Sequence, residues 1–571
     1  MDFRNSFPMI FAITILIPTL GISGAVHAQT EMKYLPDEVL VAFRTGTSGS
    51  AIASAHAAVG GSVQRVIPRF GLQVVKVASG TVLDQVQVYQ RNPNVEYAQP
   101  NYLRPLTLPT EGSFAPNINV IDEQWSLHNT GQALQTYTDP NTGGLIWPVT
   151  RSDADIDMAE AWDVTQGSSS VLVAVLDSGV DCNHPDLDAK CGDNEDHVSV
   201  TVNSFGEPIP ELIDVIGHGT HVAGTVGMET DNGGGGAGVG WNTGIGSFKV
   251  CYAETFLGIV VGSNCLDSDI VSGIDRVIEL GTYSVINMSF GGGPSPAVES
   301  ALNAAFGEGI VLIAAAGNGG TWLKVYPAAY GNVVAVGATS PVDDRASFST
   351  FSTDDDDWVD LLAPGDPILS TVPSVFCGAA DADCFQWLQG TSTAAPHASG
   401  VAALVWSQLL AADPGNANAL ANRDEVIRRL QDCADRIGAM GQDMQIWSRY
   451  GRLNAHGAVT CSGSSPPPPP STGDHIASLE GTSSGSGPTW SATVTITVHA
   501  AVESLIGDGA VIAGEWDAAD GVVSDSCVTS GGSGSCSVNL GGIHRREPSV
   551  LFSVINLPAG EGPDSITVSK P

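Results

Sequence analysis

The chain is long and acidic, and these two properties exclude several classes of protein. Its 571 residues are too many for one ordinary core, so at least two domains are expected. Hydrophobic residues make up 43% of the chain, which excludes a largely disordered protein. The formal net charge of −38 would repel nucleic acids and anionic membranes, so neither is expected as a partner.

Residues 1–28 have the pattern of a secretory signal peptide. A basic residue precedes an apolar run over residues 9–22, and Val26-His27-Ala28 offers a cleavage site after Ala28. The run is shorter than a membrane-spanning helix requires, and two prolines weaken that alternative further. We therefore expect a secreted, extracellular monomer without a membrane anchor.

Residues 29–110 predict a small α+β domain. Its segments follow one another in the order β-α-β-β-α-β, which is the ferredoxin-like arrangement. The expected strands are residues 38–43, 62–67, 72–78 and 95–98, and the expected helices are 50–58 and 82–91. The domain holds no catalytic constellation, and its position favours an inhibitory propeptide over a binding module. Residues 104–121, rich in Pro and Asn, are expected to be its cleavable connection.

Residues 111–461 form the largest predicted domain and have an α/β pattern. Strands that alternate with helices predict a parallel sheet with helices on both faces. The expected strands are residues 171–176, 284–288, 310–315 and 333–336, and the expected helices are 155–162, 218–226, 268–280 and 296–306. In such sheets, catalytic and binding residues gather at the carboxyl ends of the strands.

A proline-rich linker and a third domain are expected at the C-terminus. Residues 462–474 contain five consecutive prolines, which indicates a semi-rigid extended linker. Residues 475–571 contain Thr- and Val-rich segments separated by Gly and Ser, and they predict a small β-sandwich. Its expected strands are residues 491–498, 510–516, 536–540 and 550–554.

Ten cysteines in a chain with a signal peptide indicate disulfide bonds. No Cys-x-x-Cys occurs, so a zinc cluster is not favoured. The cysteines fall into neighbouring couples, and we expect local pairing, although the sequence alone does not fix the connectivity. The couples are Cys182/Cys191, Cys251/Cys265, Cys377/Cys384, Cys433/Cys461 and Cys527/Cys536.

Three polar residues stand where this fold class places chemistry. Asp177 ends the strand at residues 171–176, and His218 lies between two glycines at the start of a predicted helix. Ser392 follows Gly390-Thr391 at the start of a long Ala- and Val-rich helix, whose N-terminus favours a developing negative charge. Structural roles are the alternatives for two of them, with Asp177 initiating a turn and Ser392 capping a helix.

Together the three residues supply an orienting carboxylate, a general base and a nucleophile, in the order Asp, His, Ser. An esterase would instead show Gly-x-Ser-x-Gly and the order Ser, Asp, His, but Ala394 replaces the second glycine here. Zinc bound by His218 and His221 is not favoured, because no glutamate completes a His-Glu-x-x-His motif.

The three motifs resemble those of the subtilisin-like serine peptidases, or subtilases. The resemblance is carried by Asp177-Ser178-Gly179, Gly217-His218-Gly219-Thr220-His221 and Gly390-Thr391-Ser392, and it spans about residues 125–459. It implies a subtilisin-like parallel sheet, with Ser392 as nucleophile, His218 as proton shuttle and Asp177 as the carboxylate that orients His218. Residues 34–102 resemble the propeptide of the family, and the C-terminal module resembles Ig-like domains of exported bacterial proteins.

The resemblance also implies further site residues. Asn318, in Ala315-Ala316-Gly317-Asn318, matches the residue that donates to the oxyanion, and Ala316 and Gly317 are expected to contact the substrate. Ser289-Phe290-Gly291 resembles the segment that pairs with an extended substrate backbone. Asp186 and Asn232 match places where family members bind a structural calcium ion, and their oxygen atoms suit that ion.

These observations predict a calcium-stabilised serine endopeptidase that hydrolyses peptide bonds of extracellular proteins through an acyl-enzyme. We expect it to be made as a self-processing zymogen, with its own propeptide as intramolecular inhibitor. The alternative from another class is a non-enzymatic binding or adhesion protein on a protease-like scaffold. That alternative predicts a broken triad, whereas all three positions and Asn318 are intact.

Overall fold

The computed structural model describes the chain from residue 32 onward, with gaps. The described residues are 32–106, 123–134, 137–138, 145–146, 150–209, 212–257, 259–353, 356–377, 384–413, 419–439 and 441–461, followed by the strands of the C-terminal module. The predicted signal peptide and proline-rich linker lie outside these residues. No described helix is both long and apolar enough to span a membrane.

The N-terminal module has the expected β-α-β-β-α-β order. Its elements are β1 (Tyr34–Phe43), α1 (Gly49–Ala58), β2 (Ser62–Ile67), η1 (Pro68–Phe70), β3 (Leu72–Lys76), α2 (Val82–Gln90) and β4 (Val95–Arg104). The strands pair antiparallel in the order β4-β1-β3-β2. Side chains of β1 alternate between two cores, because Val39 and Val41 face α1 and α2 whereas Leu40 and Ala42 face the neighbouring α/β body.

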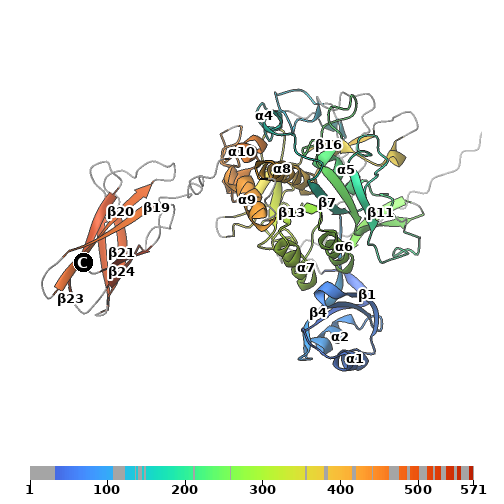
Figure 1. Cartoon of the computed structure of the whole chain (residues 1–571), viewed down its shortest axis with the longest axis horizontal. Helices are drawn as coiled ribbons and strands as arrows, with labels where there is room; N and C mark the ends of the chain where they lie inside the picture. The colour runs from blue at the N-terminus through green and yellow to red at the C-terminus, as the bar shows by residue number, and fades with distance from the viewer. Residues whose placement is uncertain are drawn as a thin grey trace, which may run out of the picture.

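The α/β body is built on an eight-stranded sheet in which every strand is parallel to its neighbours (Figure 1). Its order is β18-β15-β14-β13-β12-β7-β9-β8. The strands are β7 (Leu172–Asp177), β8 (Cys191–Asp196), β9 (Gly244–Lys249), β12 (Tyr283–Met288), β13 (Val311–Ala315), β14 (Val334–Thr339), β15 (Leu361–Pro364) and β18 (Gly451–Arg452). The predicted parallel sheet is therefore confirmed, and four of its strands are additional to those expected.

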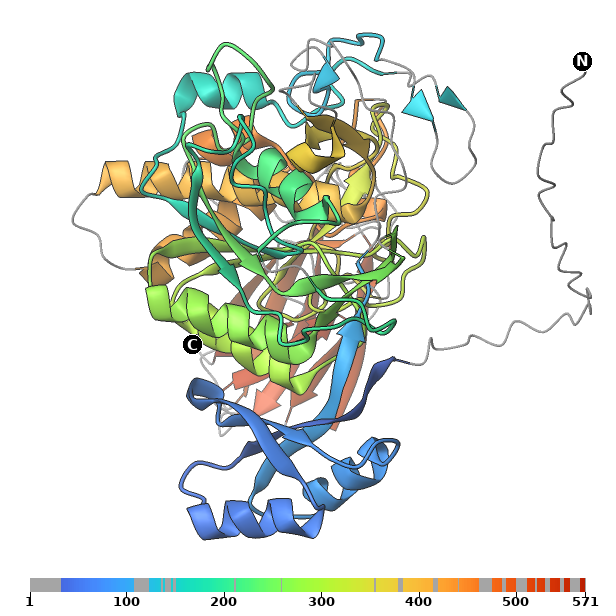
Figure 2. The same cartoon turned by 90° about the vertical axis from the view of Figure 1, so that its right-hand side faces the viewer.

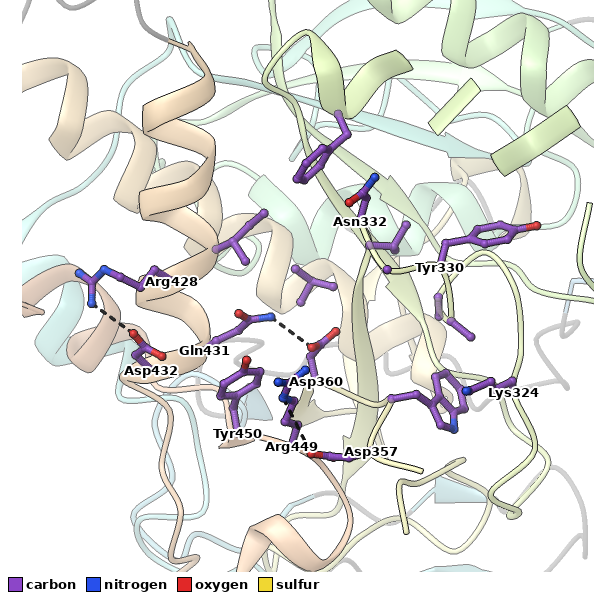
Figure 3. Close-up of a pocket in the computed structure, with 18 of the residues that line it drawn as sticks. Lys324, Tyr330, Asn332, Asp357, Asp360, Arg428, Gln431, Asp432, Arg449 and Tyr450 are labelled. Carbon is purple, nitrogen blue, oxygen red and sulfur yellow. Dashed lines mark hydrogen bonds and ion pairs between the residues drawn. The ribbon is translucent and has the colours of Figure 1, made fainter. Parts of the chain in front are cut away.

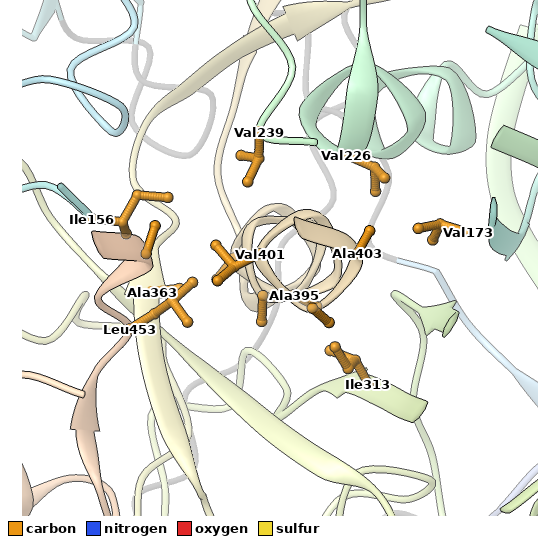
Figure 4. Close-up of a cluster of buried hydrophobic side chains, with 14 of the residues drawn as sticks. Ile156, Val173, Val226, Val239, Ile313, Ala363, Ala395, Val401, Ala403 and Leu453 are labelled. Carbon is orange, nitrogen blue, oxygen red and sulfur yellow. The ribbon is translucent and has the colours of Figure 1, made fainter. Parts of the chain in front are cut away.

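Helices cover both faces of this sheet and define two cores. Figure 4 shows α8 (Thr391–Ala412) in the first core, with Val226 and Val239 on one side of the helix and sheet residues such as Ile313 on the other. The other face packs against α6 (Asp267–Leu280) and α7 (Pro296–Gly307). Alternate strand residues divide between the cores, since Val173 and Val175 belong to the first and Ala174 and Leu176 to the second.

Shorter elements complete the described part of the body. They are β5 (Tyr137–Thr138), β6 (Leu145–Ile146), α4 (Met158–Val164), α5 (His218–Gly227), β10 (Cys251–Phe256), β11 (Ile259–Leu266), β16 (Ile368–Thr371), η2 (Ser374–Phe376), β17 (Phe385–Leu388), α9 (Ala419–Asp432), η3 (Met444–Ile446) and α10 (Ala455–Thr460). Disulfides join four of the five cysteine couples, Cys182–Cys191, Cys251–Cys265, Cys377–Cys384 and Cys433–Cys461. The side chains of Cys527 and Cys536 lie outside the described residues, so their pairing stays a prediction.

One sheet runs from the N-terminal module into the α/β body. Arg104 and Leu103 of β4 pair antiparallel with Cys265 and Leu266 of β11, which gives a six-stranded sheet in the order β10-β11-β4-β1-β3-β2. In Figure 2 the module lies below α6 and α7, and β4 extends upward from it into the body. The expected strand at residues 95–98 is thus longer than the prediction, because β11 offers it a further partner.

The C-terminal module consists of two antiparallel sheets. One contains β19 (His475–Ser484), β20 (Thr489–His499) and β23 (Ser535–His544). The other contains β21 (Val511–Ala518), β22 (Gly521–Val528), β24 (Ser549–Val554) and β25 (Ser565–Ser569). Two antiparallel sheets agree with the predicted β-sandwich, whereas its Ig-like character stays a prediction.

Candidate active site

Asp177 and His218 meet at the carboxyl edge of the parallel sheet. Asp177 is the last residue of β7 and is fully buried, and His218 is the first residue of α5. The Nδ1 atom of His218 lies 2.8 Å from Oδ1 of Asp177, which also accepts a hydrogen bond from the backbone N–H of Ser178. Among the described residues, Nε2 of His218 has no hydrogen-bond partner, so it can accept a proton from a group in the cleft.

The approach of these two side chains requires a glycine after His218. A Cβ atom on Gly219 would collide with the carbonyl oxygen of Gly179 and would lie 3.1 Å from Cβ of Asp177. Gly217, which precedes the helix, has φ of 85°, a conformation that disfavours other residues. The glycines around His218 therefore let α5 begin directly over the end of β7.

Burial and charge act on the pKa of His218 in opposite directions. Removal from water favours the neutral imidazole and lowers the pKa. The charge of Asp177 and the hydrogen bond to it raise the pKa, and the charge of Asp214 adds to them, so that the net shift is upward from 6.5. An imidazole with a raised pKa holds a transferred proton more readily, as a general base must.

Ser392 lies in the first turn of α8, next to Asn318. A Cβ atom placed on Gly390 would be 2.7 Å from Oγ of Ser392 and 3.2 Å from Nδ2 of Asn318, so both polar atoms border the same small space. The orientation of Asn318 is fixed, because its Oδ1 accepts hydrogen bonds from the backbone N–H and the hydroxyl of Thr391. This leaves Nδ2 as the amide group that faces Ser392.

The segment after β12 braces this turn. The hydroxyl of Ser289 donates a 2.8 Å hydrogen bond to the carbonyl of Ser392 and accepts one from Nδ2 of Asn287. Phe290 is buried, and the chain continues through Gly291 to Gly292, which pairs with Tyr326. Of the expected substrate-binding residues in this segment, Ser289 thus contacts Ser392 directly. On another side, the N–H of Gly317 donates to the hydroxyl of Thr391.

Asp214 belongs to the site but escaped the analysis of the sequence. It is buried, and its Oδ2 accepts hydrogen bonds from the N–H and hydroxyl of Thr220, on α5. Its Oδ1 accepts from the hydroxyl of Ser178 and from the N–H of Gly217. Asp214 therefore ties the ends of β7 and α5 together around the Asp177–His218 pair. The usual cap pattern does not mark Asp214 in the sequence, because the N-cap position of α5 is Gly217, three residues later.

His221 has a structural role. Its Nε2 lies 3.1 Å from the carbonyl oxygen of Ile368 and 3.2 Å from that of Gln386, so the ring joins α5 to β16 and β17. Burial lowers its pKa to about 3, which keeps the ring neutral. Among the described residues, no group of three or more His, Cys, Asp and Glu side chains is arranged to hold a metal ion.

The structure places Asp186 and Asn232 together but gives their atoms another function. Nδ2 of Asn232 donates to Oδ1 of Asp186 at 2.8 Å, and the N–H of Gly236 donates to Oδ2 at 3.0 Å. Oδ1 of Asn232 accepts from the N–H of Gly234. Calcium needs a shell of oxygen ligands, whereas this carboxylate faces N–H donors. The expected calcium site does not fit this arrangement, in which Asp186 fastens the glycine-rich loop.

A pocket of about 550 Å³ lies at the opposite, amino edge of the sheet (Figure 3). It is bordered by the residues that precede β14 and β15 and by α9, and it contains charged groups of both signs, including Asp360 and Arg449. Because parallel strands place all their carboxyl ends at one edge, this pocket is separated from Asp177 and Ser392 by the length of the strands.

Comparison with known proteins agrees with this geometry. Residues 168–430 match the model of the Subtilase family, and residues 22–101 match that of the Fervidolysin N-terminal prodomain. The chain is 35% identical over 432 residues to a thermophilic serine proteinase of Bacillus sp. (strain AK1), covering 75% of this chain and 88% of that protein. It is 33% identical over 305 residues to thermitase of Thermoactinomyces vulgaris, covering 53% of this chain and 93% of that protein.

A solved structure shows the same fold. Fervidolysin from Fervidobacterium pennivorans matches with a TM-score of 0.52 at 22% identity, covering 92% of this chain and 71% of that one. The chain belongs to the subtilase family. It is a serine endopeptidase with an N-terminal prodomain, and the predicted enzyme class is confirmed.

Proposed function

We propose that Asp177, His218 and Ser392 form the catalytic triad of a secreted subtilase and that Asn318 completes its oxyanion hole. The proposal is supported by two pairs of side chains at the carboxyl edge of the sheet. Asp177 holds the Nδ1 side of His218 at 2.8 Å, and the Ser392 hydroxyl borders the same space as the Asn318 amide. The remaining expectations are a signal peptide at residues 1–28, a propeptide at 29–110 and an Ig-like module at 475–571.

The chemistry follows from these positions. Oγ of Ser392 attacks the carbonyl carbon of the scissile bond while its proton passes to Nε2 of His218, and Asp177 stabilises the imidazolium that forms. The oxyanion accepts hydrogen bonds from Nδ2 of Asn318 and the N–H of Ser392. The intermediate collapses when His218 protonates the leaving amine. In the second half of the reaction, His218 takes a proton from a water molecule that attacks the acyl-enzyme. It then returns this proton to Oγ of Ser392 as the acid product leaves.

The first experiment compares the wild type with Ser392→Ala and Ser407→Ala by intact mass and by casein hydrolysis. Ser407 lies on the same helix and its hydroxyl donates to the carbonyl of Ala403, so it controls for a buried serine lost from α8. We expect the wild type and Ser407→Ala to lose the N-terminal module and digest casein. Ser392→Ala should stay full length and inactive. Full-length, inactive wild type would instead support the binding-protein alternative.

The proposal that a calcium ion stabilises the protein rests only on its membership of the subtilase family. Chelation by EDTA should lower the melting temperature if an ion stabilises the chain. Because Asp186 is already engaged with N–H donors, we expect the same EDTA-dependent shift in the wild type and in Asp186→Asn. A shift that disappears in Asp186→Asn would restore this residue as a ligand.

A further inference from the structure

The contact between the N-terminal module and the α/β body contains a buried arginine from the module. The side chains of Arg104 and Asp267 are 2% and 0% exposed, and Nε of Arg104 lies 2.5 Å from Oδ1 of Asp267. Nη1 of Arg104 donates to the carbonyl oxygens of Gly293 and Tyr326, both at 3.0 Å. One guanidinium therefore satisfies three acceptors that the body supplies.

The site is shaped for a guanidinium more than for an ammonium group. Its acceptors are a carboxylate and two carbonyls that receive separate N–H groups of the planar fork. Gly292 forms part of its wall, since a Cβ atom there would be 3.2 Å from Nη1 and 3.3 Å from Cγ of Arg104. A lysine would carry its donors on a single atom and could not match all three directions as well.

The site also lies on the path toward Ser392. Gly292 and Gly293 continue the segment from Ser289, whose hydroxyl bonds to the Ser392 carbonyl. Four residues of chain span at most about 13 Å, which corresponds to up to three or four residues of an extended substrate. Arg104 and Leu106 run along β11, with Arg104 opposite Cys265 and the hydroxyl of Ser263 donating to the carbonyl of Leu106. This part of the module therefore lies along β11 as an extended peptide would.

We propose that Asp267, with the carbonyls of Gly293 and Tyr326, is a subsite that selects an arginine side chain of the substrate on the amino side of the scissile bond. Arg104 is its internal ligand in the zymogen. This inference rests on the proposed function. Once the module leaves, Asp267 loses the cation that pairs with it, and a peptide arginine restores the pair. The net charge of −38 attracts basic peptides in addition.

The full chain is expressed and allowed to process itself, and its product then cleaves a denatured protein mixture, with the peptides identified by mass spectrometry. We expect arginine to be enriched at one position three or four residues before the cut, and Asp267→Asn to abolish that enrichment. Asp275→Asn is the matched control, because Asp275 also lies on α6 and pairs with Arg69 of the module at a more exposed place. Its product should keep the enrichment.

A second measurement uses only the wild-type enzyme, so it does not require an enzyme variant to fold. A synthetic peptide with the sequence of residues 99–108 should inhibit the processed wild type, and replacement of its arginine by alanine should raise Ki by about 30-fold or more. Replacement by lysine should give an intermediate value. Equal Ki values, or cleavage of casein without arginine enrichment, would overturn the subsite and leave the proposed function intact. Failure of the wild type to digest casein would overturn the proposed function itself.

Discussion

Each edge of the parallel sheet contains a carboxyl group, and the two carboxyl groups differ in their hydrogen-bond partners. At the carboxyl edge, Asp177 hydrogen-bonds to an imidazole that can become positively charged. At the amino edge, Asp360 accepts from two neutral donors, the N–H of Ala335 and Nε2 of Gln431. Burial raises the pKa of Asp360 to about 7, only partly offset by the hydrogen bond from Ala335. Asp177 can therefore stabilise a positive charge that forms during catalysis, whereas the charge of Asp360 changes with pH near neutrality.

The largest loss of activity is expected for Asp177→Asn, at the carboxyl edge of the sheet. The asparagine amide cannot stabilise an imidazolium and favours the wrong tautomer of His218, so kcat should fall by about 10⁴-fold. Peptide hydrolysis measured on purified protein checks this, with the melting temperature as a control for folding. Activity within tenfold of the wild type would show that Asp177 is only a turn residue.

A smaller loss is expected for Asn318→Ala, because one donor to the oxyanion disappears while the nucleophile and base remain. Removal of such a donor in a family member lowers kcat by about 10²–10³-fold. The variant should keep KM close to that of the wild type, since the oxyanion forms only during the reaction. A change confined to KM would contradict the assigned role.

The pH profile sharpens the role of the carboxyl edge further. His218 must be neutral to accept a proton, so kcat/KM should fall about tenfold per pH unit below its pKa, which lies above 6.5. Asp214→Asn removes a negative charge that raises this pKa, so its profile should move to lower pH. Profiles of the two proteins that coincide would show that Asp214 acts only on packing.

The amino edge should affect stability and leave catalysis unchanged. The folded state holds a proton on Asp360 up to about pH 7, whereas the unfolded chain loses it near 3.8, so its contribution to stability falls as pH rises between these values. Asp360→Asn should flatten the dependence of melting temperature on pH in this window. Asp432→Asn, from the same pocket, is the control and should leave the slope unchanged. A steeper slope in Asp360→Asn would contradict this account.

Much of the architecture could be predicted from the sequence because its signals are local. The strand that ends at Asp177 and the helices that begin at His218 and Thr391 are marked by hydrophobic runs and glycines, and they lie where the patterns predict. The strand β9, with sequence Gly-Ile-Gly-Ser-Phe-Lys, lacks such a run and was missed. Its residues are buried by neighbours distant in sequence, which no local pattern reports.

The parts of the site that escaped prediction depend on distant contacts. Asp214 acts through Ser178 and Thr220, and Arg104 meets Asp267 across 163 residues of chain. The two expected calcium ligands do not suit the ion in this arrangement for a related reason. The residue types suited the ion, but the direction of the Asn232 amide is fixed by its neighbours, which only the folded loop reveals.

The pairing of β4 with β11 has a consequence for evolution and design. If self-processing removes β4, the same strand edge and the same acidic subsite that held the inhibitor become the surface that receives substrates. A mutation there that raises the affinity for substrates must also raise the affinity for the propeptide. A mutation that speeds release of the propeptide must also weaken the turnover of arginine-containing peptides. Under this proposal, inhibition by the propeptide and preference for arginine depend on the same residues, so selection cannot easily change one without the other.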